Sequence, residues 1–63
     1  MNILRYKRMV LELSQEDLAL KSGLKQCQIS QFETGRLQPY PPQAERLAVV
    51  LGIDADDLQK EVS

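Results

Sequence analysis

A single glycine between two short helical patterns constrains this chain more than any other feature. The stretch 15–32 reads QEDLALKSGLKQCQISQF, with Gly23 near its centre. Before the glycine, Ala19 is small where two helices have to approach closely, and after it Ile29 and Phe32 mark one face of a second helix. A residue without a Cβ adopts the left-handed conformation that ends a helix at the lowest cost. The stretch therefore predicts two helices joined by a tight turn.

Residues suited to caps set the expected helix ends. Ser14 fits the N-cap of the second helix, with Asp17 in the capping-box position three residues later. Gly35 and Gly52 fit the ends of the third and fourth helices. We expect helices over residues 2 to about 12, about 15–22, about 25–34 and about 41–51, and a fifth that begins after Asp54. The prediction is an all-α fold, one domain over residues 1–63, with five short helices around one core.

Composition excludes several classes of protein. One cysteine and no histidine leave no internal disulfide, no zinc cluster of His and Cys, and no usual base for nucleophilic catalysis. The adjacent acids Asp56 and Asp57 point in different directions on a helix and fit a solvated helix start. No segment has the length of a membrane span, and charges interrupt the N-terminus where a signal peptide is apolar. We expect a cytoplasmic protein that is not an enzyme, with no metal, cofactor or evident small-molecule ligand.

The net charge of −1 conceals an asymmetry between the two parts of the chain. Residues 1–40 carry six basic and four acidic side chains, whereas residues 41–63 carry two basic and five acidic ones. The basic part contains the pair of helices around the glycine, which is the asymmetry expected if that part meets phosphate. Because the field is weak, affinity has to come from dimerisation and from a few well-placed contacts.

The third helix has an unusual polar face. At about 100° per residue, the side opposite Ile29 and Phe32 carries polar or small side chains and no acid. A merely solvated face more often carries Lys and Glu, whereas glutamine can pair with adenine N6 and N7 and serine with either kind of base pair. We therefore predict that this face reads bases, with Cys27 as a small groove-facing side chain and not a redox sensor. The predicted base-reading residues are Gln26, Cys27, Gln28, Ser30 and Gln31.

These motifs occur in one order at fixed spacings. They are LSQEDLA at 13–19, SGL at 22–24, ISQFETGR at 29–36, Pro39, LA at 47–48 and LGI at 51–53. Over residues 13–53, about two thirds of the chain, the sequence resembles the Cro/CI-type (XRE) family of phage and bacterial repressors. The resemblance implies a lambda-repressor-like fold whose second and third helices form a helix-turn-helix. It further implies a homodimeric transcriptional regulator that binds double-stranded DNA, with the helix at about 25–34 in the major groove.

The resemblance also assigns roles to residues outside the base-reading face. Arg8 and Glu33 match a pair that joins the first helix to the recognition helix. Lys25 departs from the Ser or Thr usual at that N-cap, a choice explained if a phosphate pairs with it. Tyr40 either donates its hydroxyl to a phosphate or caps the core. The expected contacts to the DNA backbone are Gln15, Lys25, Arg36 and Tyr40.

Other departures from the family leave alternatives open. Family members often have glycine at the position of Glu12, and they usually have a polar residue at Leu20 and an apolar one at Ser22. Either Leu20 and Ser22 compensate for one another or Leu20 is an exposed contact point. The second hypothesis for the whole chain is a protein–protein interaction module of the antitoxin or co-activator type. Val49 and Val62 are candidates for a dimer surface away from the third helix.

Overall fold

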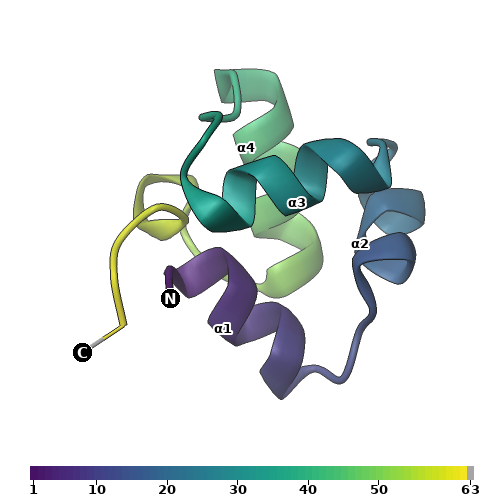
Figure 1. Ribbon diagram of the computed structural model, residues 1–63, viewed down its shortest axis with the longest axis horizontal. Helices are drawn as coiled ribbons and strands as arrows, with labels where there is room; N and C mark the ends of the chain where they lie inside the picture. The colour runs from purple at the N-terminus through teal and green to yellow at the C-terminus, as the bar shows by residue number, and fades with distance from the viewer. Residues whose placement is uncertain (63) are drawn as a thin grey trace.

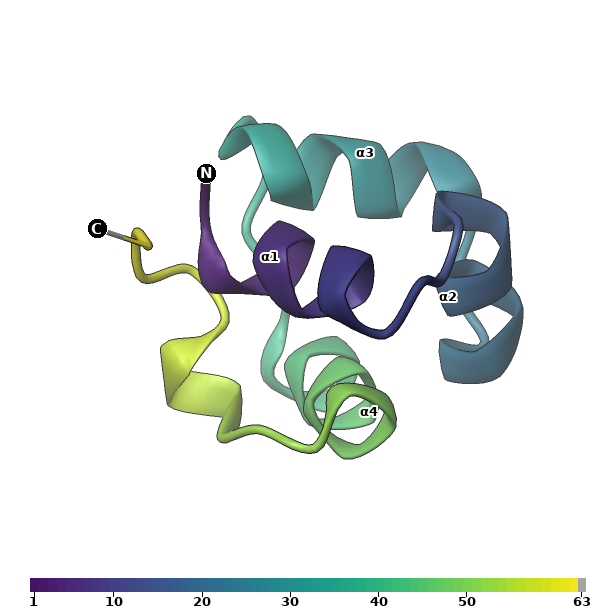
Figure 2. The ribbon, with the colours of Figure 1, turned by 90° about the horizontal axis from the view of Figure 1, so that it is seen from below.

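Four α-helices and one 3₁₀ turn make up the computed structural model, which describes residues 1–62 (Figure 1). They are α1 (Ile3–Val10), α2 (Gln15–Ser22), α3 (Gln26–Thr34), α4 (Pro41–Leu51) and the turn η1 (Ala55–Asp57). Figure 2 shows α3 along one side of the molecule and α4 on the opposite side, with α1 between them and α2 at one end. None of the helices in this part of the chain combines the length and the hydropathy needed to cross a membrane.

The core takes apolar side chains from every element except η1. Full burial of a side chain of this kind contributes about 1.5–3 kcal/mol, so these residues dominate the stability of the domain. Ala44 and Val50 of α4 are half-buried and pack against the cluster. The buried cluster consists of Leu4, Leu18, Ala19, Ile29, Phe32, Leu47, Leu51 and Leu58.

The first helix is shorter than predicted. We expected it to reach about Glu12, but α1 ends at Val10. Glu12 has a φ of 58°, in the left-handed region. A non-glycine residue there costs about 1–2 kcal/mol, which is the physical reason for the glycine that the family often has. The Leu13 N–H donates to the Arg8 carbonyl at 3.0 Å, so the turn closes at Glu12 without a glycine.

The predicted fifth helix is wrong. Ala55–Asp57 forms only a 3₁₀ turn, and Asp54 makes no side-chain capping hydrogen bond within residues 1–62. Leu58 follows the turn and is buried.

The chain beyond η1 pairs with the start of α1 instead of continuing as a helix. The Ile3 N–H donates to the Lys60 carbonyl at 2.8 Å, and the Leu4 N–H donates to the Leu58 carbonyl at 3.0 Å. The first N–H groups of a helix have no partner within it, so α1 takes acceptors from the C-terminal segment. A helix through this segment would instead direct the Leu58 carbonyl to the Val62 N–H.

Leu20 and Ser22 of α2 differ in burial. Ser22 is buried, and its hydroxyl donates to the Leu18 carbonyl at 2.7 Å and to the Ala19 carbonyl at 3.3 Å. A serine fits this buried place because its own helix satisfies the hydroxyl. Leu20, in contrast, is 82% exposed. The exposure that the second interpretation requires is present, and a contact at Leu20 stays a prediction.

Candidate nucleic-acid interface

The second helix starts with a complete capping box. The Asp17 N–H donates to Ser14 Oγ at 2.9 Å, and the Ser14 N–H donates to Asp17 Oδ2 at 3.1 Å. Hydrogen bonding to the Asp17 carboxylate, first from the Ser14 N–H and then from the Ser14 hydroxyl, lowers the pKa of Asp17 below the ordinary value of 3.8. The start of α2 is therefore fixed by residues within α2 and its cap.

Gly23 sets the angle between the two helices of the motif. It ends α2 with a φ of 70°, a conformation that favours glycine. The next N–H, of Leu24, donates to the Ala19 carbonyl at 2.9 Å, and the Leu24 side chain packs against the core. This closed turn holds α3 against α2 so that one face of α3 is turned outward.

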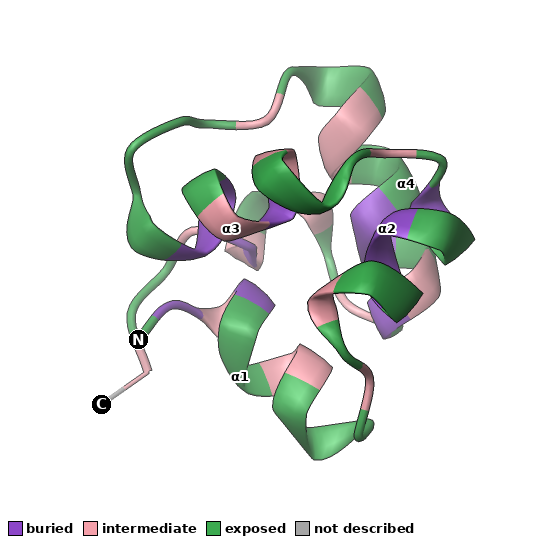
Figure 3. Cartoon of the chain, turned by 45° about the vertical axis from the view of Figure 1, so that its right-hand side comes forward, coloured by how far each residue is buried: buried purple, intermediate pink, exposed green. Residues whose placement is uncertain are grey.

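The outward face of α3 carries most of the predicted base-reading residues. On the inner side, Ile29, Phe32 and Glu33 are buried. Gln28 and Ser30 are half-buried and lie at the edge of the outward face. Figure 3 shows exposed residues alternating with buried ones along the helix. The exposed polar residues of α3 are Gln26, Cys27, Gln31 and Thr34.

The N-terminus of α3 differs from that of α2. Lys25 occupies the N-cap, and its ammonium group has no acceptor to offer the helix. Gln28 supplies half of a capping box, because its Oε1 accepts from the Lys25 N–H at 3.0 Å. The exposed Lys25 thus adds positive charge at the positive end of the helix dipole. This arrangement favours an anion at the start of α3.

The expected contact between Arg8 and Glu33 is present beneath α3. Arg8 Nε lies 2.5 Å from Glu33 Oε2, and Arg8 Nη2 lies 3.1 Å from Glu33 Oε1. The side chains of Arg8 and Glu33 are 13% and 3% exposed. Arg8 Nη1 also donates to the Leu13 carbonyl at 2.8 Å. The ion pair therefore links α1, the loop before α2, and α3.

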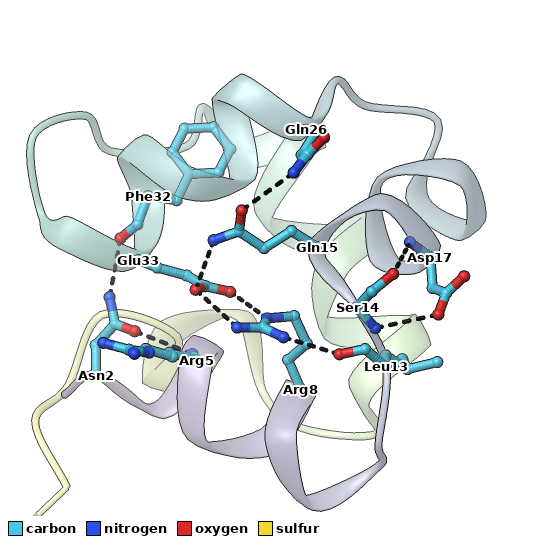
Figure 4. A network of polar contacts seen from close by, with 10 residues as sticks. All are labelled: Asn2, Arg5, Arg8, Leu13, Ser14, Gln15, Asp17, Gln26, Phe32 and Glu33. Carbon is cyan, nitrogen blue, oxygen red and sulfur yellow. Dashed lines mark hydrogen bonds and ion pairs between the residues drawn. The ribbon is translucent and has the colours of Figure 1, made fainter.

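Gln15 extends this network to the outward face of α3, as Figure 4 shows. Its Nε2 donates to Glu33 Oε1 at 3.2 Å. A carboxylate only accepts hydrogen bonds, so this contact fixes which end of the Gln15 amide faces inward. Gln15 Oε1 is left to accept from Gln26 Nε2 at 3.5 Å, the long limit of a hydrogen bond. The sequence placed Gln15 among backbone contacts and gave no sign of its link to Glu33, because the two residues are far apart in the chain.

Asn2 has two roles. It caps α1, since its Oδ1 accepts from the Arg5 N–H at 3.0 Å. Its Nδ2 also donates to the Phe32 carbonyl at 2.9 Å, so it ties the last turn of α3 to α1 (Figure 4). Asn2 is almost fully buried, which a cap residue alone does not require.

The segment after α3 presents Arg36 and Tyr40 to solvent. Tyr40 is 74% exposed, which rules out the interpretation that it caps the core. Its N–H donates to Gln43 Oε1 at 2.9 Å at the start of α4, so its backbone is held while its hydroxyl stays free to reach a ligand.

Comparison with known proteins agrees with this arrangement of helices. A family profile described as Helix-turn-helix matches residues 4–58, which include all four α-helices almost completely. A comparison with curated proteins returns no match. The profile covers far more than half of the sequence and has α2 and α3 at its centre. The chain belongs to the Cro/CI-type (XRE) helix-turn-helix family of DNA-binding regulators.

Proposed function

We propose that this protein is a transcriptional regulator that binds double-stranded DNA sequence-specifically, with α3 in the major groove. The observation that carries the proposal is that the two sides of α3 differ. Ile29, Phe32 and Glu33 hold the helix from inside, which leaves an outward face of glutamine and other polar or small side chains. Such a face suits the donor and acceptor pattern of base edges.

Gln26 is the best-supported base reader. One of its N–H groups is directed to Gln15 Oε1, which leaves Oε1 and a second N–H for a ligand. An acceptor and a donor on one amide match N6 and N7 of adenine. Gln15 is held by Glu33, and the Gln26 amide faces the free Oε1 of Gln15 at the long limit of a hydrogen bond. Cys27 and Gln31 continue the surface, with Gln28 and Ser30 at its edge.

Contacts to the DNA backbone come from residues around this face. Lys25 places an ammonium group at the start of α3, where a phosphate also gains from the helix dipole. Arg36 and Tyr40 are exposed in the segment beyond the other end of the helix. Contacts of this kind set register and orientation and carry no sequence information. Gln15, held by Glu33, contributes in this proposal mainly by orienting Gln26.

One copy of the domain is too small for a full operator. Its longest extent is 28 Å. Successive major grooves on one face of a duplex are about 34 Å apart, so one copy covers one half-site. We therefore include a homodimer in the proposal. It would be a bacterial or phage protein that acts in the cytoplasm of the cell.

The test is to substitute the proposed base-reading residues and the proposed backbone contacts separately. Gln26→Ala and Gln31→Ala should each cost about 1–3 kcal/mol against a site selected from a random duplex pool, and should relax preference at particular base pairs. Lys25→Ala should weaken binding to all sequences alike and reduce the slope of log K against log salt by about 1. Affinity is measured by fluorescence anisotropy over a range of salt, and unfolding in urea checks that each variant folds.

If the two glutamine variants keep the affinity and preference of the parent, α3 is not the base reader. The exposed Leu20 and Val49 would then favour the second candidate, a module whose main partner is a protein. The salt titration separates the two functions, because neutralisation of phosphates gives a linear loss of log K with log salt.

A further inference from the structure

The two ends of α3 are held by different helices. At its start, a tight turn and the contact of Gln26 with Gln15 join it to α2. At its end, the side chain of Asn2, the N-cap of α1, donates through Nδ2 to the Phe32 carbonyl at 2.9 Å (Figure 4). We call this last contact the Asn2 bridge. The start and the end of α3 therefore depend on different contacts.

The end of α3 carries two residues of the proposed DNA surface. Gln31, a proposed base reader, directly precedes Phe32, and Arg36, a proposed backbone contact, follows the helix. The Gln31 carbonyl accepts from the Arg36 N–H at 3.0 Å and from the Leu37 N–H at 3.3 Å, so these residues share one turn of hydrogen bonds. Both proposed contacts to DNA thus depend on where this turn lies.

The Asn2 amide uses all of its donors within the domain. Its Oδ1 accepts from the Arg5 N–H at 3.0 Å, which leaves its nitrogen for other elements. The two N–H groups of that nitrogen meet the Phe32 carbonyl and, at 3.4 Å, Gln59 Oε1. Asn2 is 3% exposed, so water does not compete for these contacts. The orientation of the amide is therefore determined from three sides.

The backbone on both sides of Asn2 is held by the C-terminal segment. The Ile3 N–H donates to the Lys60 carbonyl at 2.8 Å, and the Met1 carbonyl accepts from the Val62 N–H at 2.9 Å. The residue that supports the end of α3 is thus itself supported by a third part of the chain.

The Asn2 bridge differs in kind from the other inner contacts of α3. Arg8 binds the side chain of Glu33, which is joined to the helix by rotatable bonds. Burial of the Phe32 ring contributes free energy but has no preferred direction. Asn2, in contrast, binds the backbone of α3 directly, and a hydrogen bond of 2.9 Å requires both a distance and a direction. Among these contacts it is the one that fixes the helix backbone.

We infer that Asn2 is a positioning residue for DNA recognition, whose side-chain amide sets the place of the last turn of α3. Gln31 and Arg36 reach DNA from that turn, and a binding group has to be held within about 0.5 Å to be effective. Gln26, which is held from α2, does not depend on the Asn2 bridge. The inference rests on the proposed function and predicts that loss of the bridge affects the two ends of α3 unequally.

Two substitutions remove the Asn2 bridge and keep the cap of α1. Asn2→Asp has nearly the same shape and keeps an oxygen for the Arg5 N–H, but it has no N–H for the Phe32 carbonyl. The buried Gln59 Nε2, which has no partner within residues 1–62, can pair with the new carboxylate once the Gln59 amide turns. Asn2→Ser keeps the cap without a charge. An effect that both variants share therefore comes from the lost bridge.

Val50→Ala is the matched control for stability. Val50 is half-buried against the core on α4, which Figure 2 shows on the opposite side of the molecule from α3. Loss of its buried methyl groups should lower the stability of the fold and leave α3 in place. Urea unfolding of all variants shows whether each is folded under the conditions of the binding assay.

Base preference is the first readout. In selection from a random duplex pool, Gln26→Ala and Gln31→Ala identify the base pairs that each glutamine reads. Both Asn2 variants should lower the preference at the base pairs of Gln31 by about five- to tenfold and keep the preference at those of Gln26. Val50→Ala should change neither. In addition, Arg36→Ala should reduce the slope of log K against log salt by about 1 in the parent and by less in the Asn2→Asp background.

Amide hydrogen exchange without DNA is the second readout, followed by NMR. In both Asn2 variants the N–H groups of Arg36 and Leu37 should exchange at least about tenfold faster than in Val50→Ala, because the turn that holds them has lost its support. The Leu24 N–H, before the start of α3, should exchange as in the control.

Either readout can overturn the inference. It is wrong if both Asn2 variants keep the parent's exchange rates at the end of α3, or if they keep the parent's preference at the base pairs of Gln31. It is also wrong if they weaken the preference at the base pairs of Gln26 and Gln31 alike, as a merely structural loss would. Failure of the parent to bind any duplex would contradict the proposed function, and exchange alone would then decide whether Asn2 holds the end of α3.

Discussion

The two helices of the helix-turn-helix are nearly equal in length but are held in different ways. In α2, Ser14 and Asp17 complete a capping box, Glu16 adds a second acid to the first turn, and Lys21 lies in the last turn. Each of these charges suits its end of the helix dipole. In α3 the first turn has no acid, the last turn has no base, and Lys25 stands at the N-cap. The sequence of α2 favours its helix locally, and that of α3 does not.

Tertiary contacts compensate for the weak local signals of α3. Ile29 and Phe32 are fully buried, Glu33 is bound by Arg8 and Gln15, and Asn2 donates to the Phe32 carbonyl. These contacts all lie on the inner side of the helix. Apart from the contact of Gln26 with Gln15, the exposed side chains of the outer side hold no other element in place, so they can be chosen to suit a ligand.

The largest expected effect comes from removing the inner support of α3. Arg8→Ala leaves the buried carboxylate of Glu33 without its ion-pair partner and should lower the free energy of unfolding by about 3 kcal/mol. This is a large fraction of the stability of a domain of this size. Urea unfolding followed by circular dichroism measures the loss.

The double variant Arg8→Ala with Glu33→Ala is the control for this effect. It removes both charges, so it should lose less than the sum of the two single variants, with a coupling energy above about 1 kcal/mol. Additive losses would mean that α3 does not depend on the pair, and the contrast between the helices would then rest on apolar burial alone.

Local signals in the sequence were enough to predict most of the fold. The bounds of α2, α3 and α4 follow from Ser14, the glycines and Pro41, because caps and breakers act within a few residues. The wrong predictions concern the two ends of the fold, where the residue types nearby do not indicate the conformation. The predicted fifth helix is wrong because the Leu58 carbonyl accepts from the Leu4 N–H of α1 and not from an N–H of its own segment. The predicted end of α1 is wrong because Glu12 takes a conformation that its residue type does not indicate.

The same distinction applies to the candidate site. The outward face of α3 could be predicted because helical periodicity places its residues without further information. The link from Gln15 to Glu33 could not, since it depends on how α2 and α3 pack. The match of Arg8 with Glu33 came from resemblance to a family and not from periodicity.

Two cap substitutions with expected effects of intermediate size compare the starts of the two helices. Ser14→Ala removes the cap of α2 and should lower the free energy of unfolding by about 1 kcal/mol. Lys25→Ser supplies α3 with the cap that it lacks and should raise the free energy of unfolding by about the same amount. Urea unfolding of both variants gives the two shifts.

The second substitution should also separate stability from binding. If Lys25 pairs with a phosphate, Lys25→Ser should stabilise the fold and yet weaken binding to all DNA sequences, whereas Ser14→Ala should leave the affinity of the folded protein nearly unchanged. A Lys25→Ser variant that is less stable than the parent would show that Gln28 already satisfies the start of α3, and the two helix starts would then be equivalent.

The smallest expected effect concerns pH, because the N3 residue of the capping box is a carboxylate in α2, Asp17, and a neutral amide in α3, Gln28. Hydrogen bonds from Ser14 lower the pKa of Asp17 in the folded protein below 3.8, so the ionised carboxylate stabilises the fold above that pH. This contribution is lost as the pH falls through the lowered pKa, since the unfolded chain takes up the proton first. The difference in free energy of unfolding between the parent and Asp17→Asn should therefore be constant near neutral pH and shrink below about pH 4. Gln28→Ala alters the corresponding contact of α3, which is neutral, and its difference from the parent should not follow that course. Urea unfolding of the three proteins from neutral pH to about pH 3 makes the comparison, and a constant difference for Asp17→Asn would show that the charge of Asp17 adds nothing to the start of α2.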